Sequence, residues 1–165
     1  MKNVCFTGHR HIQNAEKLSN DLIYIIELLI QKGTVNFFTG GAIGFDSIAA
    51  QKVIELRKNY PQIKLTLILP CYEEEQTLHW TNIQKNEFQR ILLNADNVEY
   101  VSEHYFNGCM KKRNLRLVEL ADCCICYYNN KKNASGTGQT VRMALKKNIT
   151  IINLYNQKIY PKSLF

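Results

Sequence analysis

Short apolar runs alternate along this chain with amphipathic stretches of about a dozen residues or more, and this alternation limits the fold more than any other feature. The apolar runs are too short for buried helices, whereas the stretches between them carry apolar side chains at the spacing of one helix face. Strands that are joined by helices pair in parallel, because a tight hairpin cannot connect them. The sequence therefore predicts an α/β fold: a Rossmann-like three-layer sandwich with a mostly parallel sheet and helices on both faces.

No linker or internal repeat interrupts the pattern, so we expect one domain over residues 1–165. The expected strands are residues 3–6, 35–38, 64–69, 98–101, 122–127 and 150–154. The expected helices are residues 15–32, 44–59, 81–93, 109–120 and 137–147. The polar segment 71–80 is expected to be irregular and is a candidate lid, and no structure is predicted for the tail that follows residue 154.

Composition narrows the class of protein. The six cysteines form no Cys/His cluster with zinc-finger spacing, so we expect no metal site and interpret the thiols as small buried hydrophobes in a reducing cytoplasm. The most apolar helix candidate, residues 22–30, contains Glu27 and is far shorter than the ~20 residues of a membrane span, and no signal peptide is evident. A net charge of +7 favours a polyanionic partner, either a nucleotide or a nucleic acid, although scattered lysine pairs are also ordinary solvated surface.

Three strand-turn-helix junctions are typical of anion-binding sites. Each places small or hydroxylated residues where an apolar run gives way to a helix, which leaves backbone N–H groups and the positive end of the helix open to a phosphate. The ligand-binding residues expected in these turns are Thr7, Gly8, His9, Arg10, Gly40, Gly41, Gly44, Asp46, Ser135, Gly136 and Thr137. Because all three turns follow strands, we expect them to meet at the carboxyl edge of the sheet.

The second turn, residues 39–46, is the strongest local signal, because glycines permit close backbone approach and positive φ angles. It is neither a Walker loop nor a Gly-x-Gly-x-x-Gly fingerprint, and no lysine follows its last glycine, so hydrolysis of a nucleoside triphosphate is not predicted. Asp46 falls in the first turn of the following helix. An acidic residue there most often interacts with the helix dipole, and the alternative is a hydrogen bond to a ribose hydroxyl.

Side chains near these turns add candidates. Arg10 can grip a phosphate with two parallel hydrogen bonds, and His9 is either an acid or base or, more often in such a turn, a packing group. Arg113 follows two lysines in the opening turns of a helix, where a bound anion would offset the unfavourable dipole. Arg113 and Asn114 are expected on a different helix face from Leu115 and Val118, and so to turn towards the cleft or, alternatively, to solvent.

Aromatic and reactive residues are less decisive. Trp80, Tyr105 and Phe106 either stack on a base or, more often for such residues, pack against the protein. Cys109, at a helix N-terminus followed by cations, is the thiol with the best chance of a depressed pKa. The sequence contains no Gly-x-Ser-x-Gly elbow, no His-Glu-x-x-His and no compelling carboxylate pair, so we assign no catalytic residue.

These motifs resemble the YpsA-like branch of the SLOG superfamily over residues 4–154. The similar segments are Thr7–Arg10, Gly40–Asp46, Tyr105–Met110 with Arg113 and Asn114, and Ser135–Thr137 with Thr140 and Arg142. The superfamily includes the DNA-uptake protein DprA and the LOG nucleotide hydrolases, and some members sense ADP-ribose-type signals in antiphage defence. The resemblance implies a nucleotide-derived ligand, signal sensing or sequestration as a role, and Thr140 and Arg142 as further ligand-binding residues.

One departure from the LOG hydrolases bears on activity. Those enzymes carry Pro-Gly-Gly-x-Gly-Thr-x-x-Glu at the last glycine turn, whereas this chain has Arg142 and no carboxylate near the position of the catalytic glutamate. An arginine there favours holding a phosphate over activating water. The comparison therefore argues against phosphoribohydrolase activity.

The sequence thus favours non-catalytic binding of a nucleotide-derived small molecule, ADP-ribose-like or another phosphorylated nucleoside. In this hypothesis glycine amides and Thr137 hold the phosphate, Arg10 and Arg113 neutralise it, and Asp46 or Asn114 holds ribose. One alternative is an enzyme that cleaves an N-glycosidic or phosphate bond, with His9 or Asp46 as base, and a second is DprA-like binding of single-stranded nucleic acid. No cofactor is expected, and the sequence leaves open the ligand and the oligomeric state, a homo-oligomer included.

Overall fold

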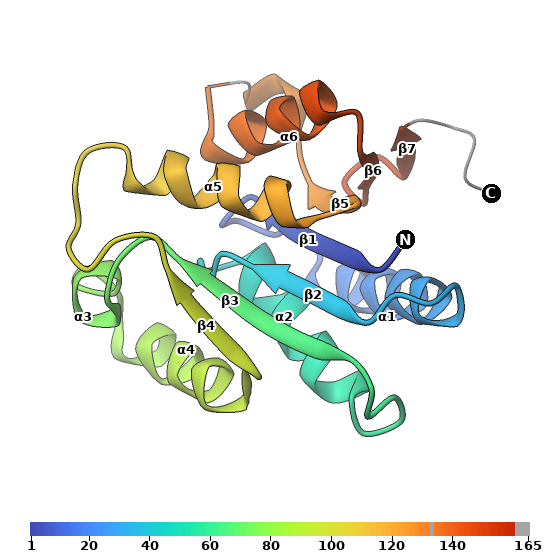
Figure 1. The fold of residues 1–165 in the computed structure, drawn as a ribbon, viewed down its shortest axis with the longest axis horizontal. Coiled ribbons are helices and arrows are strands. Elements are labelled where there is room, and N and C mark those ends of the chain that lie inside the picture. The colour runs from blue at the N-terminus through green and yellow to red at the C-terminus, as the bar shows by residue number, and fades with distance from the viewer. Residues whose placement is uncertain (133, 161–165) are drawn as a thin grey trace.

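A central sheet between two layers of helices forms this protein, whose computed structural model describes residues 1–132 and 134–160 (Figure 1). The strands are β1 (Asn3–Gly8), β2 (Asn36–Thr39), β3 (Lys64–Leu69), β4 (Asn97–Tyr100), β5 (Cys123–Tyr127), β6 (Thr150–Asn153) and β7 (Lys158–Tyr160). The helices are α1 (Ala15–Gln31), α2 (Phe45–Leu56), α3 (Glu73–Gln76), α4 (Asn82–Asn94), α5 (Cys109–Leu120) and α6 (Gly136–Lys147), with a short 3-10 helix, η1, at Asn130–Lys132.

The strand order is β4-β3-β2-β1-β5-β6-β7. The first six strands pair in parallel, and only β7 runs antiparallel, against β6. The chain winds outwards from β1 to β4 and then crosses to β5 on the other side of β1, so the sheet has its switch point between β1 and β5. Ligands of open α/β sheets bind in the crevice beyond such a point. The predicted Rossmann-like fold with a mostly parallel sheet is confirmed.

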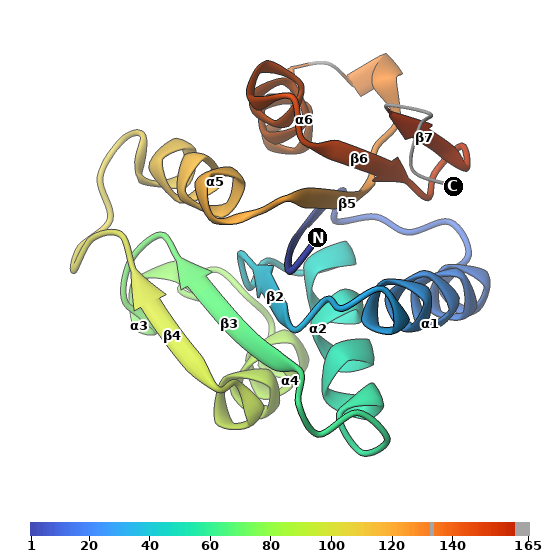
Figure 2. The same ribbon diagram turned by 45° about the vertical axis from the view of Figure 1, so that its right-hand side comes forward.

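Two helical layers cover the sheet. Helices α1, α2 and α4 lie on one face and α5 and α6 on the other, as the view turned by 45° also shows (Figure 2). Each face has its own apolar core, the larger one under α1, α2 and α4. The side chains of β5 are all buried because both faces are covered, so this strand reads as a continuous apolar run.

The cysteines of the sheet follow the strand alternation. Cys123 and Cys126 have the spacing of a Cys-x-x-Cys motif, but Cys123 belongs to the larger core cluster and Cys126 to the smaller one. A three-residue step along a strand reverses the face, so these two thiols lie on opposite sides of the sheet. All six cysteines are buried free thiols.

The predicted element boundaries differ from the structure mainly at their ends. Strand β1 continues through Thr7 and Gly8, two residues further than expected, because both pair with β5. Helix α2 ends at Leu56, where a turn begins, and the region predicted as irregular contains the short helix α3. No strand was expected at β7. Among the described residues, no helix combines the length and the apolar character that crossing a membrane requires.

Candidate functional site

A pocket of about 300 Å³ opens at the carboxyl edge of the sheet, beside the switch point between β1 and β5. It collects residues from all three predicted turns and from one face of α5. Its lining residues are Thr7, Gly8, His9, Arg10, Ala42, Asp46, Met110, Arg113, Asn114, Leu117, Ser135, Gly136 and Thr137. The pocket therefore joins segments that are far apart in the sequence.

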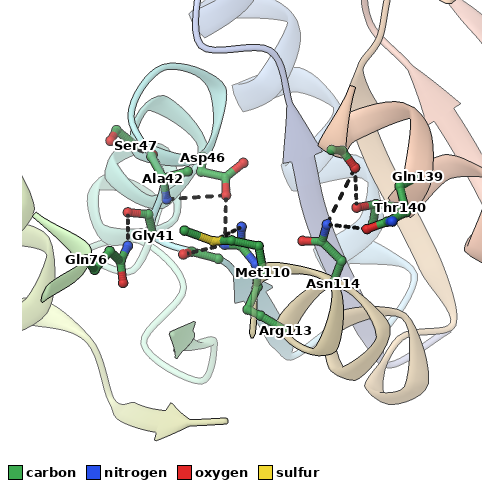
Figure 3. Close-up of polar contacts among 12 residues, drawn as sticks. Gly41, Ala42, Asp46, Ser47, Gln76, Met110, Arg113, Asn114, Gln139 and Thr140 are labelled. Atoms are coloured by element: carbon green, nitrogen blue, oxygen red, sulfur yellow. Dashed lines mark hydrogen bonds and ion pairs between the residues drawn. The ribbon is translucent and has the colours of Figure 1, made fainter. Parts of the chain in front are cut away.

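A buried carboxylate and a buried guanidinium lie together in this pocket. Asp46, in the first turn of α2, is 5% exposed, and Arg113 of α5 is 8% exposed. Nη1 of Arg113 lies 3.9 Å from Oδ2 of Asp46 and donates a shorter hydrogen bond, 2.6 Å, to the carbonyl of Gly40 (Figure 3). Nε of Arg113 is buried and has no hydrogen-bond partner among the described residues. The ion pair is therefore loose, and the guanidinium keeps one unused donor.

Burial dominates the titration of both groups. Desolvation raises the pKa of Asp46 from 3.8 to about 6, although Arg113 and the backbone N–H groups of Ala42, Gly40 and Gly8 all favour the charged carboxylate. Desolvation likewise lowers the pKa of Arg113, and the neighbouring cation Arg10 lowers it further, against the pull of Asp46. Each partner is thus charged at a cost that the pairing does not offset, as in many functional sites.

The amides of the second glycine turn face this carboxylate. The N–H of Ala42 donates to Oδ2 of Asp46 at 3.4 Å, and the N–H groups of Gly40 and Gly8 also stabilise its charge. Asp46 therefore occupies the place that we expected a ligand phosphate to take at this turn. The amides of this turn therefore stabilise a protein carboxylate that lines the pocket.

The glycines of this turn make room for protein groups. A Cβ on Gly40 would lie 1.5 Å from Nη1 of Arg113, and a Cβ on Gly44, where φ is +86°, would lie 2.3 Å from the carbonyl oxygen of Arg10. The carbonyl of Gly41 accepts a hydrogen bond from Nε2 of Gln76 at 3.1 Å. None of Gly40, Gly41 and Gly44 lines the pocket, within the part of the chain that the structure describes.

His9 and Arg10 of the first turn have different surroundings. His9 accepts a hydrogen bond at Nε2 from the N–H of Asn129, 3.0 Å away, and its ring packs against Tyr128. This geometry fits the packing role for His9 better than the role of a base. Arg10 is exposed at the pocket, close enough to Arg113 to lower the pKa of that guanidinium. Two cations therefore lie near each other at this edge.

The third turn begins α6 and directs the N-terminus of this helix at the pocket. The hydroxyl of Ser135 caps the helix by accepting from the N–H of Gly138 at 3.0 Å. The N–H groups of Gly136 and Thr137 have no partner among the described residues, as is usual in the first turn of a helix, and both residues line the pocket. This turn presents a helix N-terminus to the pocket, and anion binding there stays a prediction.

Helix α5 connects the two sides of the pocket. Arg113 reaches towards α2, whereas its neighbour Asn114 donates from Nδ2 to the carbonyl of Gly136 at 3.5 Å and to Oε1 of Gln139 at 3.4 Å (Figure 3). Met110 and Leu117 also line the pocket, a pair that the sequence analysis missed. Their spacing from Arg113 and Asn114 puts all four on one helix face, which is the signal that could have found them.

Leu115 and Val118 were expected to share a face of α5 that differs from the face of Arg113 and Asn114. This expectation was wrong in part, because Leu115 is 45% exposed whereas Val118 is buried. Leu117 is buried in its place, since it lies one helix turn from Asn114 and Arg113. The face of α5 that carries the cation is thus the inner face.

Several predicted residues lie elsewhere. Thr140 is buried and its hydroxyl donates to the carbonyl of Gly136, and Arg142 is exposed beside a separate hollow of α6. Trp80 packs edge-on against Phe88 of α4. Tyr105 and Phe106 are exposed, and among the described residues neither they nor segment 71–80 lines the pocket.

Reactive thiols and metal ligands add nothing to this site. Cys109 is fully buried, which argues against the accessible reactive thiol that the sequence suggested. Within residues 1–132 and 134–160, no group of three or more His, Cys, Asp or Glu side chains is placed to hold a metal ion. The pocket chemistry comes from one buried carboxylate, two guanidiniums, an amide and a helix N-terminus.

Two curated bacterial proteins are similar to this chain in sequence. The chain is 32% identical over 143 residues to the SPbeta prophage-derived protein YoqJ of Bacillus subtilis (strain 168), covering 79% of this chain and 81% of YoqJ. It is 28% identical over 130 residues to the UPF0398 protein BH1768 of Halalkalibacterium halodurans, covering 78% of this chain and 66% of that protein.

A solved structure and a family profile complete the comparison. The X-ray structure of TM1055 superimposes with a TM-score of 0.61 at 17% identity, covering 95% of this chain and 76% of TM1055, which shows a shared fold. The profile YpsA, described as the YspA SLOG family, matches residues 6–158. Because this match spans most of the chain, the protein belongs to the YpsA-type SLOG family.

Proposed function

We propose that the pocket beside β1 and β5 binds a phosphorylated nucleoside without turning it over. The observation that carries this proposal is the convergence of Arg10, Arg113 and the open N-terminus of α6 on one pocket at the switch point of the sheet. Membership of the SLOG family supports a nucleotide-related role.

The phosphate belongs at the N-terminus of α6. There the N–H groups of Gly136 and Thr137 and the helix dipole favour an anion, and the exposed guanidinium of Arg10 lines the same pocket. The carboxylate of Asp46 keeps a phosphate away from the α2 side. A volume of about 300 Å³ lies at the lower end of ligand pockets, which favours a mononucleotide or one nucleoside half of an ADP-ribose-like molecule.

Binding without turnover suits sensing or sequestration of such a molecule. The prophage origin in the name of YoqJ supports a role at the boundary between phage and host, including antiphage signalling. The buried free thiols support a reducing, cytoplasmic setting.

Calorimetry with AMP and ADP-ribose tests the proposal. The wild type is expected to bind at least one of the two, and Arg10→Ala is expected to weaken binding about tenfold or more, the usual loss for one charge-assisted hydrogen bond. Arg90→Ala, on the exposed surface of α4, is the matched control and should bind as the wild type does. Absence of binding by the wild type, or an equal loss in both variants, would contradict the proposal.

One observation favours a second candidate, a hydrolase of the same ligand. Asp46 lines the pocket with a pKa of about 6, in the range of a general acid or base. His9 is the weaker candidate for that role, since its Nε2 already accepts a backbone N–H. Chromatography of AMP and ADP-ribose after prolonged incubation distinguishes the two candidates, because only an enzyme releases adenine or cleaves a phosphate bond of the ligand.

A further inference from the structure

The two ends of the pocket differ in their electrostatics. At the α6 end, the N–H groups of Gly136 and Thr137 provide positive potential, whereas Asp46, the carboxylate among the described lining residues, belongs to α2. The backbone of Arg10 packs beside Gly44, where α2 begins, and its exposed side chain lines the same pocket. At the α2 end, the charge of Arg113 is opposed by Asp46, 3.9 Å away, and the guanidinium already donates 2.6 Å to the carbonyl of Gly40. The α6 end is therefore the end at which no buried carboxylate of the described residues opposes the positive potential.

A carboxylate buried this deeply acts strongly on nearby charges. Asp46 is 5% exposed, so water screens little of its field, and a phosphate beside it would meet a negative charge that Arg113, 3.9 Å away, offsets only in part. The carboxylate can still accept hydrogen bonds: it accepts the N–H of Ala42 at the long distance of 3.4 Å, and Arg113 keeps an unpartnered Nε. Such a surface suits an uncharged group that donates hydrogen bonds, and vicinal hydroxyls are the matching chemistry.

We propose that Asp46 determines the ligand class of this pocket: it admits ribonucleoside 5′-monophosphates, whose ribose hydroxyls donate to its carboxylate, and excludes ligands with a second phosphate on the ribose. This inference rests on the proposed function. It assigns the α6 end to the 5′-phosphate and the α2 end to the sugar hydroxyls. Arg113 lies beside Asp46 at the α2 end and adds to the positive potential of the pocket as a whole.

Calorimetry with AMP, 2′-deoxy-AMP and adenosine 3′,5′-bisphosphate tests this assignment. The wild type is expected to bind AMP about tenfold or more tighter than the other two compounds, because each lacks a hydroxyl donor or adds a repelled charge. Asp46→Asn keeps the shape and removes the charge. This variant is expected to bind AMP more weakly than the wild type and the bisphosphate more tightly, so the two affinities move in opposite directions.

Asp21→Asn is the matched control, because Asp21 lies on α1 and pairs with Lys17. It should keep the wild-type order of affinities. Circular dichroism establishes that Asp46→Asn is folded, and the wild-type panel decides the matter by itself if that variant does not fold. Equal binding of AMP and the bisphosphate by the wild type overturns this inference and leaves the proposed function standing. Failure of the wild type to bind any of the three compounds or ADP-ribose removes both.

Discussion

The space beside Gly40 belongs to the guanidinium of Arg113. A Cβ at this position would lie 1.5 Å from Nη1 and 2.4 Å from Cζ of Arg113, so no larger residue fits while the arginine stays in place. The arginine cannot simply move away, because its departure would leave Asp46 buried without a counter-charge. Gly40 thus sets the geometry of the pocket from outside it.

We therefore expect Gly40→Ala to lower the free energy of unfolding by about 3 kcal/mol, the cost of breaking a buried pair. Urea denaturation measures this loss. Gly136→Ala is the matched control, because a Cβ there would meet only Nδ2 of Asn114, at 4.0 Å. Similar stability of Gly40→Ala and Gly136→Ala would contradict the role assigned to Gly40.

Asp46 also predicts how stability depends on pH. Its pKa in the folded protein, about 6, lies above the ordinary value of 3.8, so the folded state holds this proton more tightly than the unfolded chain. The resulting stabilisation is fully present below pH 3.8 and is lost as the pH rises through about 6. Asp46→Asn has no such proton to lose, so its stability relative to the wild type should rise over this range by on the order of 3 kcal/mol.

Urea denaturation of both proteins between about pH 4 and 8 measures this difference. Asp96→Asn is the control with the opposite sign. Burial acts to raise the pKa of Asp96, but the N–H of Leu65 and the cations Lys64 and Arg57 outweigh it and lower the pKa below 3.8. The contribution of Asp96 is thus complete at neutral pH and is lost only in acid. A flat difference for Asp46→Asn across this range would show that the carboxylate titrates normally.

At the scale of elements, α6 matters through its first turn. The hydroxyl of Ser135 caps the helix at the N–H of Gly138, which holds the neighbouring amides of Gly136 and Thr137 towards the pocket. Thr81 caps α4 in the same way, in a capping box with Gln84, but α4 does not reach the pocket among the described residues. The two caps allow helix stability and ligand binding to be separated.

We expect Ser135→Ala and Thr81→Ala each to lower the free energy of unfolding by about 1 kcal/mol, the usual value of an N-cap. Only Ser135→Ala should also weaken the binding of AMP, because loss of the cap frees the proposed phosphate-binding turn to move. Thermal denaturation and calorimetry measure the two effects. Equal AMP affinity in both variants would place the phosphate elsewhere.

The five long helices and the six parallel strands could be predicted from the sequence, whereas α3 and β7 could not. Helix α5 was expected at its observed limits, since apolar residues repeat at helical spacing along it. Helix α3 has four residues and β7 has three, too few for a period to be visible. Strand β7 also depends on pairing with β6, which is a tertiary contact.

At the scale of the whole molecule, the meeting of the three turns at one edge of the sheet was predictable from the sequence, but the contacts inside the pocket were not. Parallel strands end at one edge, so three turns that follow strands had to lie near each other. Whether an amide faces a ligand or a protein carboxylate depends on a contact between α2 and α5, which no local pattern contains. Arg113 takes part in this contact: it donates to the carbonyl of Gly40 and pairs loosely with Asp46, and its contact with phosphate stays a prediction.

The net charge of +7 leads to the last prediction. A protein that binds single-stranded nucleic acid through a basic surface neutralises many phosphates, so its affinity falls steeply with salt and rises with strand length. The pocket beside β1 and β5 has a volume of about 300 Å³, which suits a single nucleotide-sized ligand. We therefore expect AMP to bind with a shallow salt dependence, and oligothymidylates of increasing length to show no gain in affinity at physiological salt. Fluorescence anisotropy over a salt series measures both. Affinity that grows with strand length and disappears in high salt would instead assign the positive charge to nucleic acid, in the manner of DprA.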